Sequence, residues 1–253
     1  MKLATWNVNS LRVRLPQVLD WLAAQRPDVL CLQETKLPDK DFPVAELRAA
    51  GYETVFAGQP TYNGVAILSR APVADPLVSL PDFADEQKRF IAATVGGVRV
   101  VNVYVPNGQE VGSDKFRYKL QWFAALRAYL KEELKRHPDL ALVGDFNVAP
   151  EERDVHDPKL WEGQVLFSEP ERETYAKLSA CGLHDAFRKF ETGAGHYTWW
   201  DYRQAAFRRN LGLRIDHILV STTLFDRCTS CVIDTTPRRN ERPSDHVPVL
   251  AGL

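Results

Sequence analysis

Residues 140–150 read LALVGDFNVAP, and in this stretch an apolar run leads directly into polar side chains. The first four positions are typical of a buried strand, which then ends in GDFN. Because residues two apart in an extended chain point to the same side, Asp145 and Asn147 are predicted to face one common point beyond the sheet. A simple turn is the alternative, since Asp and Asn both suit strand exits and bond to their own backbone.

The composition describes a chain that can bury a large core. Its 253 residues are 45% hydrophobic, which suits two ordinary domains or one large sandwich or barrel. The N-terminal MKLATWNVNS has no long apolar run, and no stretch approaches the roughly 18 apolar residues of a membrane span. We therefore expect a soluble cytoplasmic protein with no membrane partner. The net charge of −1 provides no overall field that would steer the protein onto nucleic acid.

The four cysteines do not form a recognisable metal or redox site. Cys228 and Cys231 make a C-x-x-C, but no second Cys pair or Cys–His pair completes a zinc site. We expect structural thiols.

Two local clusters of arginine stand out from the balanced overall charge. The segment 202–215, YRQAAFRRNLGLRI, has four arginines and no acid, and 236–244, TPRRNERPS, adds three more. Aromatic residues lie among and just before the arginines of the first segment, as expected for a surface that binds phosphates and unstacked bases. A solvated surface loop is the alternative for each cluster taken alone.

The secondary-structure pattern predicts many short strands and three helices. Apolar runs punctuated by Gly, Pro and Asn predict strands at 2–8, 28–33, 52–57, 64–69, 89–95, 98–105, 140–146, 196–202, 213–220 and 246–252. The VGGV turn at 95–98 predicts a hairpin. Helical spacing predicts helices over 15–22 with Pro16 in the first turn, over 114–136, and around 171–181.

The order of these elements predicts one α/β domain over residues 1–253. No linker or low-complexity segment divides the chain. Helix-flanked and hairpin-linked strands are typical of two packed, mixed β-sheets with helices covering the outside. A rough two-fold similarity between the halves is expected, because each shows strands interrupted by one helix-rich segment.

Polar side chains interrupt the apolar runs at the strand ends. They are Asn7, Asn9, Glu34, Tyr104, Asp145, Asn147, Asp216, Asp245 and His246. Each has an ordinary explanation as a turn, cap or rim residue, although Asp216 within an apolar strand requires a partner for its charge. In mixed sheets some strands start where others end, so all of these residues can share one rim. One common pocket explains the positions of these polar residues better than a separate explanation for each of them.

Such a pocket suits metal-assisted hydrolysis of a phosphate ester. Carboxylate and amide oxygens are ligands for Mg²⁺ or Mn²⁺ rather than zinc, and the chain has no phosphate-binding GxxxxGK[ST] loop. A metal draws charge from phosphate oxygens, one Asp takes a proton from water, and His⁺, Asn and Tyr donors stabilise the developing negative charge.

Seven motifs together resemble the exonuclease III-type apurinic/apyrimidinic (AP) endonucleases of the metal-dependent endonuclease/exonuclease/phosphatase superfamily. They are WNVNSLR, LCLQETK, YNGVAILS, VVNVYVPNG, LVGDFNVAP, GLRIDHILVS and RPSDHVPV, in the expected order over nearly the whole chain. The block HYTWWDYR…GLRID points to the DNA-repair branch. The resemblance implies a four-layered α/β sandwich with two packed mixed sheets flanked by helices.

The resemblance also implies which residues bind metal. Glu34 matches the principal ligand, with Asn7 nearby and Asp245 as a further ligand or second-site contact. A second metal would use Asp145 and Asn147. Mg²⁺ is the implied cofactor, with Mn²⁺ as a substitute.

The implied catalytic groups come from the same rim. Asp145 matches the residue that activates water, and Asn147 and Tyr104 match groups that contact the scissile phosphate. His246 matches the histidine that binds a non-bridging phosphate oxygen, with Asp216 holding it charged. The His246–Asp216 pair is the alternative base, but Asp145 is favoured.

The implied substrate contacts lie around this centre. Trp199 and Leu213 match positions beside the pocket that would receive an abasic sugar, which is cheaper to extrude from a duplex than a normal nucleotide. Some relatives have an aromatic residue where this chain has Leu213, which changes the shape of the pocket. Asn9, Lys115 and Arg203 are further expected contacts to the substrate.

The implied activity is Mg²⁺-dependent incision 5′ to abasic sites in duplex DNA, with 3′→5′ exonuclease, 3′-phosphodiesterase and 3′-phosphatase activities. The expected partner is duplex DNA with abasic sites or blocked 3′ ends, bound by a monomer that associates with a bacterial nucleoid while it acts. One alternative is an enzyme that mainly processes 3′ ends and acts weakly on abasic sites.

Two further alternatives are a phosphatase or phospholipase on a non-nucleic substrate and a non-catalytic DNA-binding module. The Arg–aromatic segment 197–214 argues against the first. The second leaves Glu34, Asp145 and Asp245 unexplained, because carboxylates repel a phosphate unless a cation lies between them.

Overall fold

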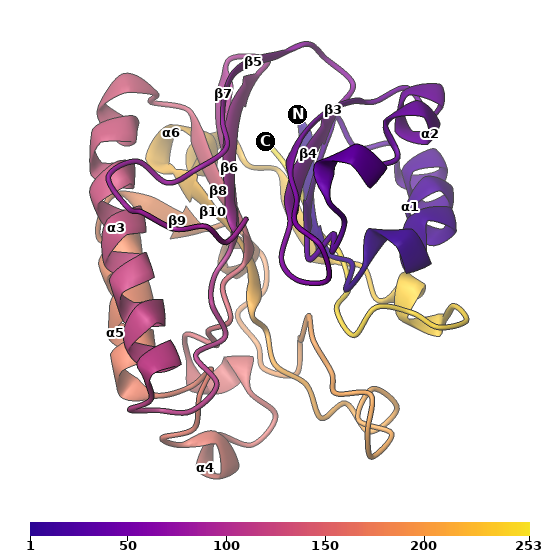
Figure 1. The fold of residues 1–253 in the computed structure, drawn as a ribbon. Coiled ribbons are helices and arrows are strands. Elements are labelled where there is room, and N and C mark those ends of the chain that lie inside the picture. The colour runs from indigo at the N-terminus through magenta and orange to yellow at the C-terminus, as the bar shows by residue number, and fades with distance from the viewer.

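The computed structural model describes residues 1–253, which form two six-stranded sheets packed face to face (Figure 1). The first sheet consists of β1 (Lys2–Asn7), β2 (Val29–Gln33), β3 (Glu53–Ala57), β4 (Val65–Ser69), β11 (Ser230–Ile233) and β12 (Val249–Gly252). The second consists of β5 (Val73–Leu77), β6 (Phe90–Val95), β7 (Val98–Tyr104), β8 (Leu140–Asp145), β9 (Leu183–Asp185) and β10 (Asp216–Ser221).

The two sheets share one topology. Their strand orders are β11-β12-β1-β2-β4-β3 and β5-β6-β7-β8-β10-β9. In each order the third and fourth strands are parallel, and all other neighbours are antiparallel. A long helix joins each parallel pair, α1 (Leu11–Gln25) in the first sheet and α3 (Asp114–Arg136) in the second. The expected two-fold similarity between the halves is therefore confirmed.

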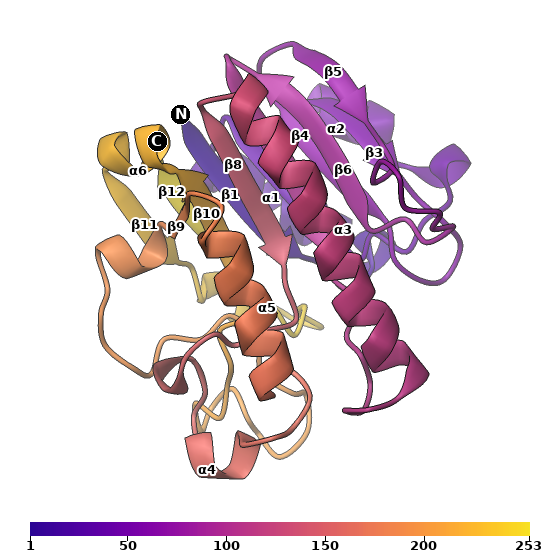
Figure 2. The same ribbon diagram turned by 90° about the vertical axis from the view of Figure 1, so that its left-hand side faces the viewer.

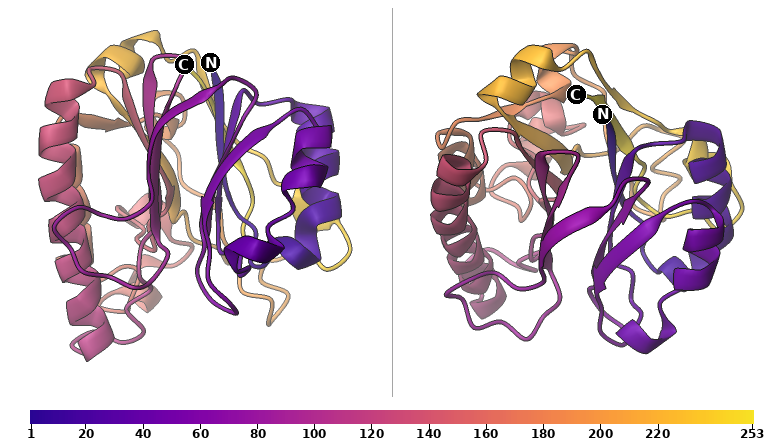
Figure 3. Two further views of the ribbon diagram at one scale, coloured as in Figure 1. Left: turned by 45° about the horizontal axis from the view of Figure 1, so that its top comes forward. Right: turned by 90° about the horizontal axis from the view of Figure 1, so that it is seen from above.

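Helices cover the two outer faces and complete the four layers. The helix α1 and the short α2 (Val44–Ala49) lie over the first sheet, and α3 and α5 (Glu169–Ser179) lie side by side over the second (Figures 1 and 2). Figure 3 shows the four layers from left to right as helices, sheet, sheet and helices. Two further short helices are α4 (Pro158–Trp161) and α6 (Thr222–Arg227). None of the helices combines the length and the apolar character needed to span a membrane.

The core lies in three apolar layers. Between the sheets, Leu3 and Ile67 of the first sheet pack in one cluster with Val143 and Ile218 of the second. The other two layers lie beneath the helices on the outer face of each sheet. Most central strands are thus buried on both faces, which explains why they read as continuous apolar runs rather than as alternating patterns.

Most predicted elements are confirmed, including the helix over 114–136 and the hairpin at Gly96–Gly97, where both residues have positive φ. The predicted strand 196–202 is wrong, because Trp199 forms only isolated bridges to Leu213 and His246. The first helix begins at Leu11, so Pro16 lies inside it rather than in its first turn. The short strands β5, β9 and β11 were not predicted: Asp75 and Pro76 interrupt β5, β9 is a three-residue LHD, and β11 has only four residues.

Gly144 allows β7 and β8 to approach each other immediately before Asp145. Its φ is +140°, and a Cβ at this position would lie 1.9 Å from the carbonyl oxygen of Val103. Since that oxygen belongs to the backbone of the neighbouring strand, no side-chain movement relieves the clash. The glycine of GDFN is thus required by strand packing.

We predict that Gly144→Ala lowers the free energy of unfolding by about 3 kcal/mol or more, because the methyl group must push β7 and β8 apart. Gly163→Ala is the matched control. Gly163 also has a positive φ, +70°, but a Cβ there meets nothing within 4 Å, so the expected cost is only about 1 kcal/mol of backbone strain. Urea denaturation of both variants measures the difference, and equal losses would contradict this explanation.

Candidate active site

Strand register brings three of the predicted residues into one row at the end of the second sheet. Tyr104, the last residue of β7, is paired with Asp145, the last residue of β8, and Asp145 is paired with Asp216, the first residue of β10. The antiparallel β10 starts where β8 ends, as the shared rim requires. Asp145 and Asp216 are each only 1% exposed.

The first sheet contributes Asn7 and Glu34 to the same end of the molecule. In the parallel pair β1–β2, Asn7 is the register partner of Gln33, and Glu34 follows directly. The Asn7 Nδ2 donates to Glu34 Oε1 and to Asp145 Oδ2, both at 2.8 Å. One amide group therefore bridges carboxylates from both sheets.

The backbone is left-handed at three of the site residues. Asn9, Glu34 and Asn147 have φ values of +43°, +51° and +50°. Such conformations cost free energy in residues other than glycine, and they occur preferentially at functional sites. Each of the three lies at, or within two residues of, the end of a strand, so the strained conformations coincide with the polar rim.

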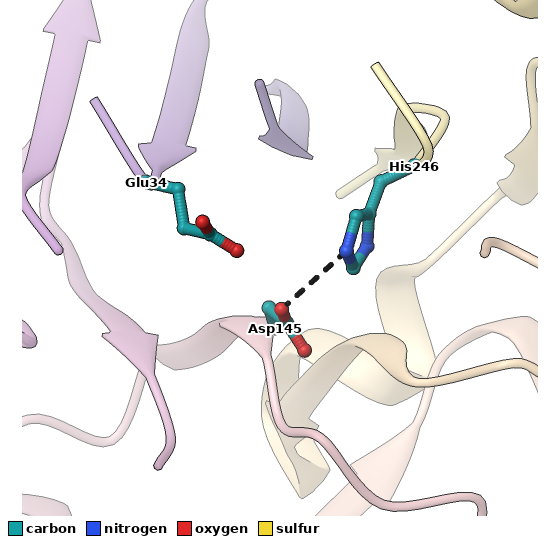
Figure 4. A group of neighbouring side chains, drawn as sticks. All are labelled: Glu34, Asp145 and His246. Atoms are coloured by element: carbon teal, nitrogen blue, oxygen red, sulfur yellow. Dashed lines mark ion pairs between the residues drawn. The ribbon is translucent and has the colours of Figure 1, made fainter. Parts of the chain in front are cut away.

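Glu34, Asp145 and His246 point toward one another (Figure 4). Each offers a potential ligand atom, and these atoms all lie within 4.8 Å of one another. Asp145 is almost completely buried, so its charge requires a compensating cation. The oxygen-rich pair Glu34 and Asp145 fits a hard divalent cation, as predicted from the sequence.

His246 is held as a cation by Asp216. Its Nδ1 lies 2.8 Å from Asp216 Oδ2, and its Nε2 lies 3.8 Å from Asp145 Oδ2. Burial alone would lower the pKa of His246, but the Asp216 and Asp145 carboxylates outweigh it and raise the pKa to about 10. A protonated imidazole cannot bind a metal, so His246 fits the predicted contact to an anionic oxygen.

Asp145 differs from His246 in its proton affinity. Burial raises the pKa of Asp145 to about 7, although the charge of His246 acts in the opposite direction. Its Oδ1 accepts the backbone N–H of Asn147 at 2.9 Å, which fixes the orientation of the carboxylate. A carboxylate with this pKa can accept a proton near neutral pH, which favours Asp145 over His246 as the base.

Asn147 and Tyr104 lie as donors beside this centre. Asn147 Oδ1 accepts from Asn107 at 3.2 Å, and Asn147 Nδ2 donates to the Val105 carbonyl at 3.0 Å. An amide nitrogen carries two hydrogens, so one stays available to a ligand. Burial, followed by the Glu34 and Asp145 charges, raises the pKa of Tyr104 well above its usual value, and its hydroxyl therefore remains protonated.

Asp245 lies outside the Glu34 cluster. Its Oδ1 accepts from Asn9 Nδ2 at 2.9 Å, and its Oδ2 accepts from Trp199 Nε1 at 3.0 Å. Its role as a metal ligand stays a prediction, and the contacts observed here connect it to two of the predicted substrate residues. Lys36, two residues after Glu34 in QETK, forms an ion pair with Glu34 Oε2 at 2.9 Å.

The other predicted substrate residues differ in their exposure. Arg203 is exposed and forms an ion pair with Asp201, and Lys115 is exposed in a groove of about 630 Å³ that Asn107 also lines. Leu213 is fully buried in a cluster with Trp199, because three chain segments close over it. Its side chain packs against Trp199, and its expected place beside the substrate pocket stays a prediction.

Sequence reasoning missed two groups that hold the GDFN turn. His217, next to Asp216, bonds through Nε2 to the Val148 carbonyl at 2.9 Å. Lys119 donates to the Asn147 carbonyl at 2.7 Å. Lys119 is three residues from both Phe116 and Trp122, so its position on the apolar face of the helix pattern was the available signal.

Comparison with known proteins agrees with this arrangement. The sequence matches the Endonuclease/Exonuclease/phosphatase family over residues 4–246. The chain belongs to this family. It is 36% identical to exodeoxyribonuclease III of Haemophilus influenzae, with 99% of each chain covered.

Two solved structures are similar over the whole length. The 3′ phosphatase NExo from Neisseria, bound to a product DNA hairpin, is 50% identical with a TM-score of 0.99 and covers 100% of this chain and 99% of its own. An AP endonuclease from Archaeoglobus fulgidus is 41% identical with a TM-score of 0.96 and the same coverage. This family member is accordingly a nuclease-type hydrolase of phosphodiester bonds, and Glu34 and Asp145 form its candidate metal cluster.

His217 makes the stability of this enzyme depend on pH. Burial, followed by the charge of Arg214, lowers the pKa of His217 to about 4, against the opposing effects of Asp185 and Asp154. Its neutral form donates to Val148 and accepts from Arg214 at 3.1 Å. Because the unfolded chain binds a proton near pH 6.5 and the folded chain does not, this contribution to stability is complete above pH 6.5 and is lost as the pH falls toward 4.

We predict that the free energy of unfolding of the wild type falls by about 3 kcal/mol more than that of His217→Gln between pH 7 and pH 4. Glutamine keeps a donor for the Val148 carbonyl but does not titrate. Denaturant unfolding at several pH values measures both curves. Parallel curves would show that His217 does not carry this pH dependence.

Proposed function

We propose that this protein is a Mg²⁺-dependent DNA-repair nuclease that incises duplex DNA 5′ to abasic sites and removes blocking groups from 3′ ends. The observation that carries the proposal is the assembly of Glu34, Asp145 and His246 within 4.8 Å at the ends of two sheets. Carboxylates from both sheets face a histidine cation there, which suits a metal ion and a phosphate bound side by side.

The donor set supports Mg²⁺ as the cofactor. Glu34 would hold the ion, and Asn7 keeps Glu34 and Asp145 oriented beside each other through its two 2.8 Å hydrogen bonds. These oxygen donors suit Mg²⁺ or Mn²⁺ and not zinc, which prefers nitrogen and sulfur. Bound there, the ion would act as a Lewis acid toward phosphate oxygens.

The protein's own side chains accept the proton from water and stabilise the charge on the phosphate. Asp145, with a pKa near 7, takes a proton from the attacking water. The His246 imidazolium, held by Asp216, donates from Nε2 to a non-bridging phosphate oxygen. The free N–H of Asn147 and the hydroxyl of Tyr104 donate to the same phosphate, so negative charge that develops during attack is stabilised.

The substrate surface proposed for DNA surrounds Trp199. Its indole, fixed by Asp245 and backed by Leu213, forms the wall beside which an extruded sugar would lie. The two arginine clusters meet nearby, where Arg238 lies 5.1 Å from the ring centre of the exposed Tyr202. Arginine and aromatic groups at such spacing suit a nucleic-acid backbone and its bases.

A second candidate is an enzyme that mainly processes 3′ ends and acts weakly on abasic sites. The observation in its favour is the 50% identity over the full length to NExo, which is described as a 3′ phosphatase. The same residues would serve both reactions, because each removes or cleaves at a phosphate ester.

Product analysis on defined DNA tests the proposal. We expect a duplex with one abasic-site analogue to be cut 5′ to the lesion in Mg²⁺, with no product in EDTA and recovery when Mg²⁺ is restored, because the carboxylate cluster repels phosphate without a cation. A duplex with a 3′-phosphate nick measures the second activity in parallel. Turnover of a soluble inositol polyphosphate without turnover of either DNA would contradict the proposal, and removal of the 3′-phosphate without incision would favour the second candidate.

The two carboxylates are expected to fail in different ways. Glu34→Ala should raise the Mg²⁺ concentration required for half-maximal activity by about tenfold or more, because the ion loses its principal ligand. Asp145→Asn should lower kcat by about 100-fold or more with little change in KM, because the amide cannot accept the proton. Mg²⁺ titrations of initial rates separate the two effects, and a near-wild-type kcat for Asp145→Asn would remove Asp145 from the chemistry.

A further inference from the structure

A buried ion pair lies behind the active site, on the side of the two outer helices. Lys119 of α3 and Glu171 of α5 form an ion pair, and both side chains are 0% exposed. Burial of two charges is costly, and such a pair is weak evidence for stability by itself. Its hydrogen bonds therefore matter more than its charges.

Lys119 donates hydrogen bonds to two loops beside the catalytic centre, one containing Asn107 and the other Asn147. Besides Glu171, its Nζ donates to the Asn147 carbonyl at 2.7 Å and to the Asn107 carbonyl at 3.0 Å. Asn107 in turn donates from its side chain to Asn147 Oδ1 at 3.2 Å. Both oxygens of Asn147 are thus held, one directly by Lys119 and the other through Asn107.

Glu171 fixes the other end of this connection. Its Oε1 accepts from the backbone N–H of Leu166 at 3.0 Å, and its Oε2 accepts from the backbone N–H of Ser168 at 3.1 Å. These bonds cap the start of α5 and keep the carboxylate in place. Lys119 therefore has a rigid anchor, and its ammonium cannot move without exposing Glu171 as an unpaired buried charge.

We propose that Lys119, anchored by Glu171, is a positioning residue that fixes the Asn147 amide for its contact with the phosphate. Asn147 has a φ of +50°, a conformation that its own backbone does not favour. The bond from Lys119 to its carbonyl compensates for this cost, while the side-chain amide keeps one N–H beyond its bond to the Val105 carbonyl. This inference rests on the proposed function, because it concerns the group that contacts the reacting phosphate.

The pair also connects the catalytic turn to the groove that contains Lys115. Asn107 and Gly108 line that groove, and Gly108 packs so closely on the Lys119 stem that a Cβ would lie 3.0 Å from its Cδ. The Lys119 ammonium group therefore sets the distance between the loop of Asn107 and Gly108 and the turn of Asn147. Movement of one loop relative to the other requires loss of a bond to Lys119.

Lys119→Met tests the inference. The methionine fills most of the space but donates no hydrogen bond, so we expect kcat to fall by about tenfold to a hundredfold with little change in KM. Arg99→Met is the matched control. Arg99 forms an ion pair with Glu133 of α3, the helix that also carries Lys119, and both residues are about 5% exposed. Neither of them contacts the loops of Asn107 and Asn147. The control is expected to lose stability and retain kcat. An equal kcat loss in both variants would overturn the inference.

The double variant Lys119→Met/Glu171→Gln separates positioning from stability. Glutamine removes the unpaired charge, and its single amide oxygen still accepts one of the two backbone N–H groups that bond to Glu171, so the free energy of unfolding should recover in part while kcat stays low. Recovery of kcat together with stability would overturn the inference. In an Asn147→Ala background, Lys119→Met should cause no further loss of kcat, and a full further loss would also overturn it.

Hydrogen exchange provides a readout that does not depend on activity. The reporters are the backbone amides of Gln109, Asn147 and Ala149, which donate to Asn107 Oδ1, Asp145 Oδ1 and the Leu166 carbonyl. Lys119→Met should speed their exchange more than Arg99→Met does, and unchanged exchange there would overturn the inference. Failure of the wild type to act on either DNA substrate would instead contradict the proposed function, so the two failures are distinguishable.

Discussion

The two hydrogen bonds from the Asn7 amide are the interaction on which the site depends. They join Glu34 of the first sheet to Asp145 of the second, at 2.8 Å each, in a region with little access to water. Carboxylates this close repel each other, and a shared donor reduces that cost without adding charge. The packing of the sheets thus joins the end of β2 and the end of β8 through hydrogen bonds to a single side chain.

The carboxylates around this bridge differ in whether a protein cation already pairs with them. Glu34 and Asp145 leave an excess of negative charge that suits a divalent cation, while Asp216 is matched by the His246 imidazolium. Asp145 and Asp216 are register neighbours on β8 and β10, but Asp145 accepts from Asn7 and from the Asn147 N–H, whereas Asp216 is hydrogen-bonded to His246 Nδ1. Buried groups behind the site, above all His217, hold the connecting turn in place.

The sequence predicted the site better than it predicted the surroundings. Strand-end positions such as Glu34 and Asp145 were recognisable because polar groups interrupt strongly apolar runs. Residues 196–202 look like a strand because they are aromatic, but their partners are single residues from distant segments. The burial of Leu213 depends on the same convergence. The Lys119–Glu171 pair joins positions 52 residues apart, and no local pattern specifies such a contact.

The repeated topology of the two sheets has a consequence for how such a site arises. Asn7 and Tyr104 end corresponding strands, and Glu34 and Asp145 lie within one residue of corresponding strand ends. Equivalent strand ends of the two sheets therefore meet at one rim, but the side chains they carry differ. In the proposed function Glu34 holds the cation and Asp145 takes the proton. Difference between the two repeats, rather than their likeness, gives the site two separate tasks.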